Sequence, residues 1–490
     1  MSQKITLHTP SEKKRLNGQL GTVGIVFMVV AAAAPLTVIG GNMPLAMGIG
    51  NGAGAPVGFI IASLVLLIFS VGFVQMTPYV DEAGAFFSYV RKGLGRRPSM
   101  GVAAVALVAY TAIQVGIYGY IGWAIDDTIR FYGGPSLPWP LYSLLVLIIV
   151  AFLGYRHIDL SAKVLGVALA LEISIVVIIN LIVVFTAGTE GLTAEPFNPA
   201  VFTEGSLGIA VLFSLTGFIG FEATAIFRDE ARNPEKTIPR ATYAAVLVIG
   251  LFYAITSWVF VVQHGADNVQ ATAQETLDGN ANMLLDTAAV TLGSMGRDIM
   301  NVLLLTSLFA CVLSFHNVIA RYQFMLASRG TLPRMLNDVH PRHLSPHKSS
   351  LVQTITAIAI LAIFAIFGVD PLVGVFGSMA GVATVGMMIL LLSTSVAVIT
   401  FFAKNPILRG RKFFRSLVAP TLASAGIVIS LWLVLSNFML VTGGSFAISL
   451  FLGLIPFVAF GIGAVFFKED EHAHEVVPQP PVEEEVEPSV

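Results

Sequence analysis

Continuous apolar runs of about 20 residues recur along nearly the whole chain, and they limit its fold more than any other feature. A helix needs about 20 apolar residues to cross a hydrocarbon core roughly 30 Å thick. Of the 490 residues, 56% are hydrophobic and only 11% are charged, whereas about a quarter are charged in an average soluble domain. The strands of a membrane β-barrel alternate apolar and polar residues, which these runs do not. The sequence therefore predicts an all-α polytopic membrane protein.

Twelve apolar runs, separated by charged or Gly/Pro-rich breaks, predict twelve transmembrane helices. They cover approximately residues 21–50, 56–78, 100–125, 140–155, 160–186, 207–227, 241–263, 299–327, 351–368, 371–402, 416–440 and 444–467. We expect three parts: a cytoplasmic N-terminal segment (1–19), the twelve-helix domain (20–467) and an acidic, proline-rich tail (468–490). The composition of the tail is typical of disordered cytoplasmic segments.

The positions of the basic residues predict how the chain is oriented. Of the 27 Lys and Arg residues, all except Arg130 and Arg297 fall on the side of the N-terminal segment when twelve spans are counted. Basic residues are enriched in cytoplasmic loops, so both termini should be cytoplasmic in a multi-pass protein of the cell (plasma or inner) membrane. The first 18 residues are polar and basic and lack a cleavage site, so we expect them to stay attached.

Two predicted spans contain residues that interrupt helices. The first has Pro35, which lacks a hydrogen-bond donor, followed by Gly40 and Gly41; the sixth has Gly217 and Gly220 on either side of Phe218. Interruptions in matching spans of two repeats indicate a binding site near the midplane, where freed N–H groups face a carboxylate and freed carbonyls face an amine. The alternative is that these residues only allow a kink or close packing.

Two acidic residues, Glu172 and Glu222, lie well inside predicted spans. A charge at the bilayer centre costs at least about 2.5 to 3.5 kcal/mol, so such acids are usually functional. Both are candidates for proton coupling. The alternative is a permanently protonated Glu that donates a hydrogen bond between helices.

Tyr110 and Gln114 share one face of the third predicted helix, at a spacing that suits a cavity wall or interhelical hydrogen bonds. A long predicted outer connection, residues 264–298, contains a stretch that can form a short helix over the outer mouth or an ordinary surface helix.

Several classes of protein lack support in the sequence. No Gly-Lys dipeptide occurs, which excludes a Walker A phosphate loop, and there is no HExxH or CxxC motif. The single cysteine, Cys311, cannot form an internal disulfide. We therefore expect no cofactor, no metal site and no assembled catalytic group, and the net charge of −2 does not suggest a nucleic-acid partner.

Three motifs give the chain a family resemblance. They are GFIGFEATAIFRDEARNPEKTIPRA (217–241), DEAGAFFSYVRKGLG (81–95) and FHNVIARYQFMLASRGTLPRML (315–336). In this order they resemble the sixth helix and its loop, the loop after helix two, and the end of helix eight in the amino acid–polyamine–organocation superfamily of permeases. The resemblance covers roughly residues 20–467.

The resemblance implies an inverted five-plus-five repeat with broken helices 1 and 6, followed by helices 11 and 12, and alternating access. Tyr110 matches an aromatic cavity position, and Glu222 matches a helix-six glutamate that some exchangers use in substrate release or proton sensing. Glu172 stands where some proton-coupled members carry a lysine. The substrate-site residues implied at the two breaks are Pro35, Thr37, Val38, Ile39, Gly40, Gly41, Thr216, Gly217, Phe218 and Gly220.

The leading hypothesis is a secondary transporter that imports an amino acid with protons as the coupling ion. The PLTVIGG sequence of helix one is closer to putrescine importers, so a polyamine or other amine carrier is the alternative within the class. A channel or a non-transporting nutrient sensor is the alternative outside it, and an enzyme is the least favoured class. Sodium coupling, exchange instead of symport, and a monomer or a homodimer all stay open.

Overall fold

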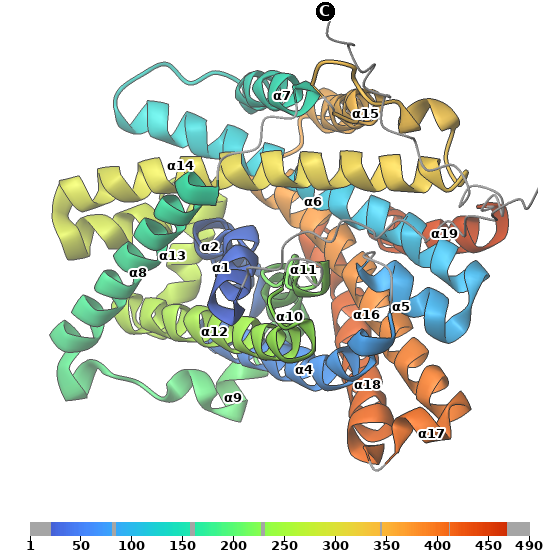
Figure 1. Ribbon diagram of the computed structural model, residues 1–490. Helices are drawn as coiled ribbons and strands as arrows, with labels where there is room; N and C mark the ends of the chain where they lie inside the picture. Colours follow the sequence, from blue (N-terminus) through green and yellow to red (C-terminus); the bar gives the residue numbers. More distant parts are fainter. Residues whose placement is uncertain are drawn as a thin grey trace, which may run out of the picture.

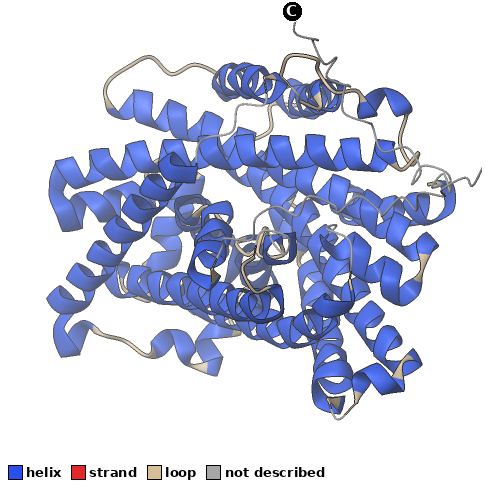
Figure 2. Ribbon diagram, in the orientation of Figure 1, coloured by secondary structure: helices blue, strands red, loops and turns tan. Residues whose placement is uncertain are grey.

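The structure, a computed structural model, describes residues 21–80, 85–156, 162–226, 231–343, 345–410 and 412–467. The N-terminal segment, the acidic tail and parts of the first two motifs therefore lie outside the described residues. Helices make up almost all of the described part, which contains no β-strand (Figure 2).

The first half of the chain contains eight α-helices and two π-helical segments. They are α1 (Thr22–Ala32), α2 (Pro35–Thr37), η1 (Val38–Asn42), α3 (Met43–Leu45), η2 (Ala46–Asn51), α4 (Ala55–Met76), α5 (Ala85–Leu94), α6 (Arg96–Phe131), α7 (Trp139–Tyr155) and α8 (Ala162–Gly191).

The second half contains eleven α-helices and two further π-helical segments. They are α9 (Pro199–Phe202), α10 (Leu207–Thr216), α11 (Ala223–Ile226), α12 (Pro234–His264), α13 (Val269–Leu277), α14 (Met283–Ser328), α15 (His347–Ile366), η8 (Pro371–Gly377), α16 (Ser378–Lys404), α17 (Pro406–Arg409), η9 (Phe414–Val418), α18 (Ala419–Ser436) and α19 (Phe446–Phe466).

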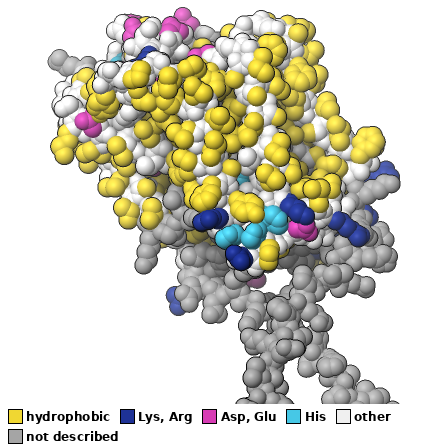
Figure 3. All heavy atoms as spheres, turned by 90° about the horizontal axis from the view of Figure 1, so that it is seen from above, with side chains coloured by type: hydrophobic (Ala, Val, Ile, Leu, Met, Phe, Trp, Pro, Cys, Tyr) yellow, Lys and Arg dark blue, Asp and Glu magenta, His cyan; other side chains and the backbone are white. Residues whose placement is uncertain are grey.

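Nine helical segments in the described residues are long and apolar enough to cross a membrane. Two shorter apolar helices, α7 and α10, accompany them. Figure 3 shows one face covered by apolar side chains, with acidic side chains gathered at one end and Lys, Arg and His at the other. This distribution is typical of a protein whose apolar belt faces lipid and whose ends face water, and it confirms the prediction of an all-helical polytopic membrane protein.

The number nine is smaller than the predicted twelve for a physical reason. The segment Thr22–Tyr79 is counted once although its path changes direction at Gly52, where φ is +55°. Helix α7 is only 17 residues long, and the predicted sixth span is divided into α10 and α11. Three predicted spans are therefore not counted separately: one is merged with its neighbour, and two correspond to helices that are too short.

Two long helices form the centre of the bundle. In the most apolar window of α6, 83% of the residues are buried, and in the segment from η8 through α16 the share is 78%, against 28% in α15 and α19. Helix α6 contacts α14, α16, α19 and η8. Helices α15 and α19 therefore lie at the lipid-facing periphery, whereas α6 and α16 support the interior, where α16 contacts α10. Helices α1, α2, α10 and α11 lie at the centre of the view in Figure 1.

Candidate binding site at two interrupted helices

The first interruption lies between α1 and α2. Ala33 ends α1, and Ala34 adopts the left-handed conformation (φ 45°, ψ 74°), the only positive φ of a non-glycine residue in the described chain. That conformation costs an L-residue roughly 1 to 2 kcal/mol. Pro35 explains its position, because a proline disfavours the α conformation of the preceding residue and starts a new helix well. The break thus precedes Pro35 instead of covering Pro35–Gly41, and those residues are helical.

The second interruption follows α10. Helix α10 ends at Thr216, six residues from Gly217 to Glu222 form turns, and α11 begins at Ala223. Gly220 has a φ of +109°, which few residues other than glycine adopt. The structure therefore interrupts the predicted sixth span in the region that the sequence predicted, Thr216–Gly220.

A small cavity of about 20 Å³ lies between the two interruptions. A cavity of this size has room for a water molecule but not for an amino acid. Its wall from the interrupted helices consists of Ala33, Thr37, Val38, Asn42, Thr216 and Ile219. The rest of the wall comes from α6 (Ile113 and Ile117), α14 (Cys311 and Phe315) and η8 (Phe376). The site is closed in this structure.

Buried Glu172 joins three helices at the first interruption. Its carboxylate accepts a hydrogen bond from Ser307 Oγ of α14 at 3.0 Å and lies beside the backbone N–H of Leu36. Leu36 is the second residue of α2, so its N–H is one of the donors that have no partner inside the helix. Glu172 of α8 thus lies at the buried N-terminal end of α2.

Buried Glu222 holds the second interruption. Its Oε1 accepts a hydrogen bond from the hydroxyl of Tyr110 at 2.8 Å, and its Oε2 accepts one from the backbone N–H of Gly220 at 2.9 Å. The carboxyl group therefore fixes the turn between α10 and α11 to α6. Neither Glu222 nor Tyr110 is part of the cavity wall.

Comparison with known proteins identifies the family. The amino acid permease family matches residues 20–466. This chain belongs to that family. A branched-chain amino acid permease, BcaP of Bacillus subtilis, is 24% identical over 470 residues, which cover 92% of this chain and 94% of the relative. The serine/threonine exchanger SteT of the same organism is 22% identical, covering 67% and 74%. An arginine/agmatine antiporter of Chlamydia pneumoniae is 24% identical, covering 70% of each chain.

Family membership confirms the resemblance to amino acid–polyamine–organocation permeases and the expectation that the protein is a membrane transporter and not an enzyme. Discontinuous helices in transporters mark substrate and ion sites, so the two interruptions are the candidate binding site of this permease.

The predicted site residues of this permease fall into two groups. Thr37, Val38 and Thr216 line the cavity. The others surround it without lining it: Pro35, Ile39, Gly40, Gly41, Gly217, Phe218 and Gly220.

Gly40 and Gly41 allow close packing of α6 and η8 on the first span. A Cβ atom on Gly40 would lie 2.5 Å from the hydroxyl oxygen of Tyr120, and one on Gly41 would lie 2.8 Å from the ring of Phe376. Real Cβ atoms do not approach so closely. The close-packing interpretation of these glycines therefore fits the structure.

Gln114 belongs to a chain of buried glutamines. Gln353 of α15 donates to its Oε1 at 2.6 Å, and Gln323 of α14 donates to Gln353 at 3.2 Å. The chain joins α6, α14 and α15 at a distance from the cavity wall. This arrangement matches the interhelical hydrogen bonds that the sequence left open as an alternative.

Asn42 is the polar cavity residue that the sequence reasoning missed. Its Nδ2 donates to the carbonyl oxygen of Phe213 at 2.9 Å, which ties the first interrupted helix to the second. A polar amide inside an apolar span is a usable signal, because such groups form interhelical hydrogen bonds. Phe315, Phe376 and Cys311 give no comparable signal, since the chain contains 34 phenylalanines and many apolar positions.

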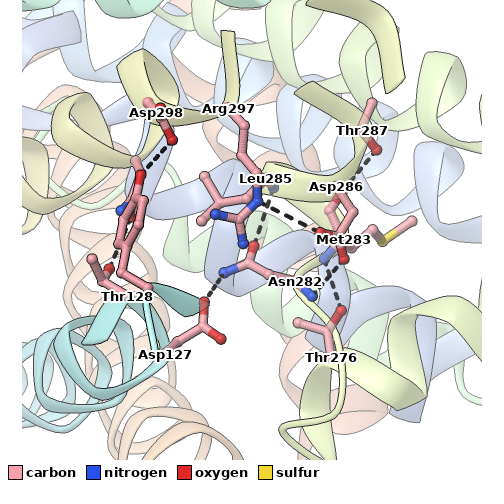
Figure 4. A network of polar contacts seen from close by, with 12 residues as sticks. Asp127, Thr128, Thr276, Asn282, Met283, Leu285, Asp286, Thr287, Arg297 and Asp298 are labelled. Carbon is pink, nitrogen blue, oxygen red and sulfur yellow. Dashed lines mark hydrogen bonds and ion pairs between the residues drawn. The ribbon is translucent and has the colours of Figure 1, made fainter. Parts of the chain in front are cut away.

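The predicted outer connection covers one side of the site. Leu277 of α13 lies against Gly48, and Leu284 of α14 lies against Gly40, so these helices pack on the first span. A polar network holds them (Figure 4): Asn282 donates to Asp127 of α6 at 2.8 Å, and Arg297 lies 3.9 Å from Asp286. The predicted short helix of this connection is the beginning of α14, which packs on the first span without lining the cavity.

Proposed function

We propose that this permease imports an amino acid by proton-coupled alternating access, in a twelve-helix frame of two inverted five-helix repeats followed by two further helices. The observation that carries the proposal is the position of the Glu172 carboxylate, which is buried, accepts a hydrogen bond from Ser307 and lies beside the backbone N–H of Leu36. A carboxylate already sits at the N-terminal end of α2, where the amides and the helix dipole favour negative charge.

The carboxylate of the substrate would bind at this same end of α2. It would displace Glu172, which would then move away from the N–H of Leu36 and take up a proton. Binding of substrate and binding of a proton are linked in this scheme, because each favours the departure of the Glu172 carboxylate from the amides. Proton coupling therefore needs no second cation site.

The amino group of the substrate would face the C-terminal end of α10. The last carbonyl groups of a helix carry partial negative charge, which favours a cation. Thr216, at that end, already interacts with Thr384 of α16 at 2.5 Å between hydroxyl oxygens. Glu222, which fixes the adjacent turn, would hold the carbonyls in place and would be the second group to sense protons.

The chemistry of the cavity wall favours a neutral amino acid with an aliphatic side chain. Ile113, Ile117, Val38 and Ile219 are apolar, and none of the described lining residues is acidic. A diamine would bring a second ammonium group without a counter-charge, and burying such a group is costly. The named substrates of BcaP agree with an aliphatic preference.

The test is uptake by the full-length protein in liposomes with an inward proton gradient. We expect saturable, concentrative uptake of labelled branched-chain amino acids, and no uptake of putrescine. Uptake of diamines but not of amino acids would overturn the substrate proposal. Saturable counterflow of labelled substrate is expected of a carrier; its absence would favour a sensor, and flux without saturation would favour a channel.

A further inference from the structure

A second cavity lies at one end of the helix bundle, away from the proposed substrate site. It has a volume of about 650 Å³ and lies where α4 ends, α12 begins and η9 leads into α18. These are the ends of three candidate membrane spans. The cavity therefore lies at the level where a bilayer changes from hydrocarbon to headgroups.

The lining of this cavity is divided between charged and apolar groups. Lys412 and Arg415 supply two positive charges, and Glu235 supplies one negative charge. Within the described part of the chain, neither Lys412 nor Arg415 lies within 4.0 Å of a carboxylate oxygen, so Glu235 does not neutralise them. Both side chains are exposed. The cavity thus carries a net positive charge that no described group of the protein pairs with.

The apolar part of the lining continues along α4 and η9. Val71 and Val74 extend from the cavity into the membrane-spanning part of α4, and Phe414 lies beside Arg415. Gln75 and Tyr243 add polar groups to the lining, and Tyr243 is close enough to Arg415 for the two to interact electrostatically.

The connection that carries the two cations has the character of an interfacial segment. Ile407 is 94% exposed and Phe413 is 55% exposed, although basic residues surround them. Exposed apolar residues next to Lys and Arg are typical of segments that lie in the membrane surface. The cavity therefore opens beside acyl chains as well as beside water.

We propose that this cavity binds an anionic phospholipid. Lys412 and Arg415 hold the phosphate, Gln75 and Tyr243 lie beside the glycerol esters, and an acyl chain follows Val71 and Val74. Basic pockets between transmembrane helices bind lipids of this kind by combining charge with apolar contact. The net charge of the lining is +1, which complements a headgroup of charge −1 better than a neutral one.

The bound lipid would connect helices that support the interruptions. Helix α4 packs against α10, and α12 packs against α1. A lipid bridging α4, α12 and η9 would stabilise this arrangement. The proposal does not depend on which amino acid is carried or on proton coupling.

The experiment measures thermal unfolding of the full-length protein in neutral detergent with added phosphatidylglycerol, phosphatidylcholine or inorganic phosphate. We expect phosphatidylglycerol to raise the midpoint of unfolding, and the other two to leave it unchanged. Native mass spectrometry should show phosphatidylglycerol retained on the protein. An equal effect of phosphatidylcholine would overturn the anionic preference, and an equal effect of inorganic phosphate would identify a soluble anion as the ligand.

Three variants make the test specific to the cavity. The double variant Lys412→Gln/Arg415→Gln should weaken phosphatidylglycerol binding about 30-fold, since each basic residue contributes to lipid attraction. Arg409→Gln removes a cation from the same connection outside the cavity and should change little. Glu235→Gln removes the repelling charge and should strengthen binding, which a merely unfolded variant cannot imitate. Undiminished binding in the double variant, or weaker binding in Glu235→Gln, would overturn the proposal.

Discussion

A single carboxylate, Glu172, connects the first interruption with the proposed proton coupling. It accepts a hydrogen bond from Ser307, lies beside the N–H of Leu36, and is 4% exposed. Most intramembrane acids are retained because they pair with a group or carry a proton. For Glu172 this group is the N-terminal end of α2, which also binds the substrate carboxylate in the proposed mechanism.

Glu172→Gln should abolish acceleration of uptake by an inward proton gradient and leave counterflow exchange in place. The amide keeps the size of the side chain but cannot exchange a proton. The measurement is initial uptake in liposomes with and without the gradient. Ser307→Ala is the matched control, because it removes one hydrogen bond and keeps the carboxyl group. Concentrative uptake by Glu172→Gln at the normal rate would remove Glu172 from the mechanism.

Tyr110→Phe should lower the stability of the protein by about 1.5 to 3 kcal/mol, the range for a hydrogen bond to a charged group. The variant removes the donor from buried Glu222, 2.8 Å away. The measurement is denaturant or thermal unfolding in detergent. Tyr322→Phe is the control, since the buried hydroxyl of Tyr322 has no hydrogen-bond partner among the described residues. Equal losses in both variants would show that the hydrogen bond to Glu222 is unimportant.

At the scale of elements, the first span depends on two glycines that let neighbouring helices approach. Gly40 faces Tyr120 of α6 and Leu284 of α14, so the part of the span after the interruption packs against both helices. An added methyl group in such a contact forces a shift of helices.

Gly40→Ala should destabilise the protein by about 1 to 3 kcal/mol, the usual range for an overpacked interior. The new Cβ would lie 2.5 Å from the Tyr120 hydroxyl, which has no hydrogen-bond partner in the described part of the chain. Tyr120→Phe should therefore restore part of the loss in the double variant. Gly461→Ala in α19, where nothing lies within 4 Å, should be nearly neutral. A double variant no more stable than Gly40→Ala would contradict the proposed clash.

At the scale of the whole molecule, the structure is closed around a cavity of about 20 Å³. Alternating access requires this cavity to open to each side in turn. The protein contains one cysteine, and that residue, Cys311, is in the cavity wall. The reactivity of Cys311 can therefore report whether the cavity is open, without an engineered cysteine.

A small thiol reagent should modify Cys311 slowly, and a saturating amino acid substrate should slow it further. Substrate would occupy the cavity next to the thiol. The measurement is the rate of labelling of the full-length protein in liposomes, with inhibition of uptake as a second readout. Cys311→Ser should transport without being inhibited by the reagent. Labelling at the same rate with and without a transported substrate would place the substrate elsewhere.

The sequence by itself determined the features that depend on local composition. Long continuous apolar runs require helices in a membrane, because only helices and closed β-barrels satisfy their backbone groups there and barrel strands alternate apolar and polar residues. The glycines of the sixth span predicted an interruption that begins after Thr216, and the rarity of intramembrane acids drew attention to Glu172 and Glu222. Each of these signals lies within a few residues of the chain.

Only the tertiary structure decided what surrounds the interruptions. Asn42 meets Phe213, Glu172 meets Leu36 and Gln114 meets Gln353 across separations of more than 100 residues. A cavity wall is made of such long-range contacts. A hydropathy profile cannot predict them, because it averages over residues that are neighbours in sequence. The physical reason is that the chain specifies which surfaces are apolar, whereas the packing of helices specifies which of those surfaces face one another.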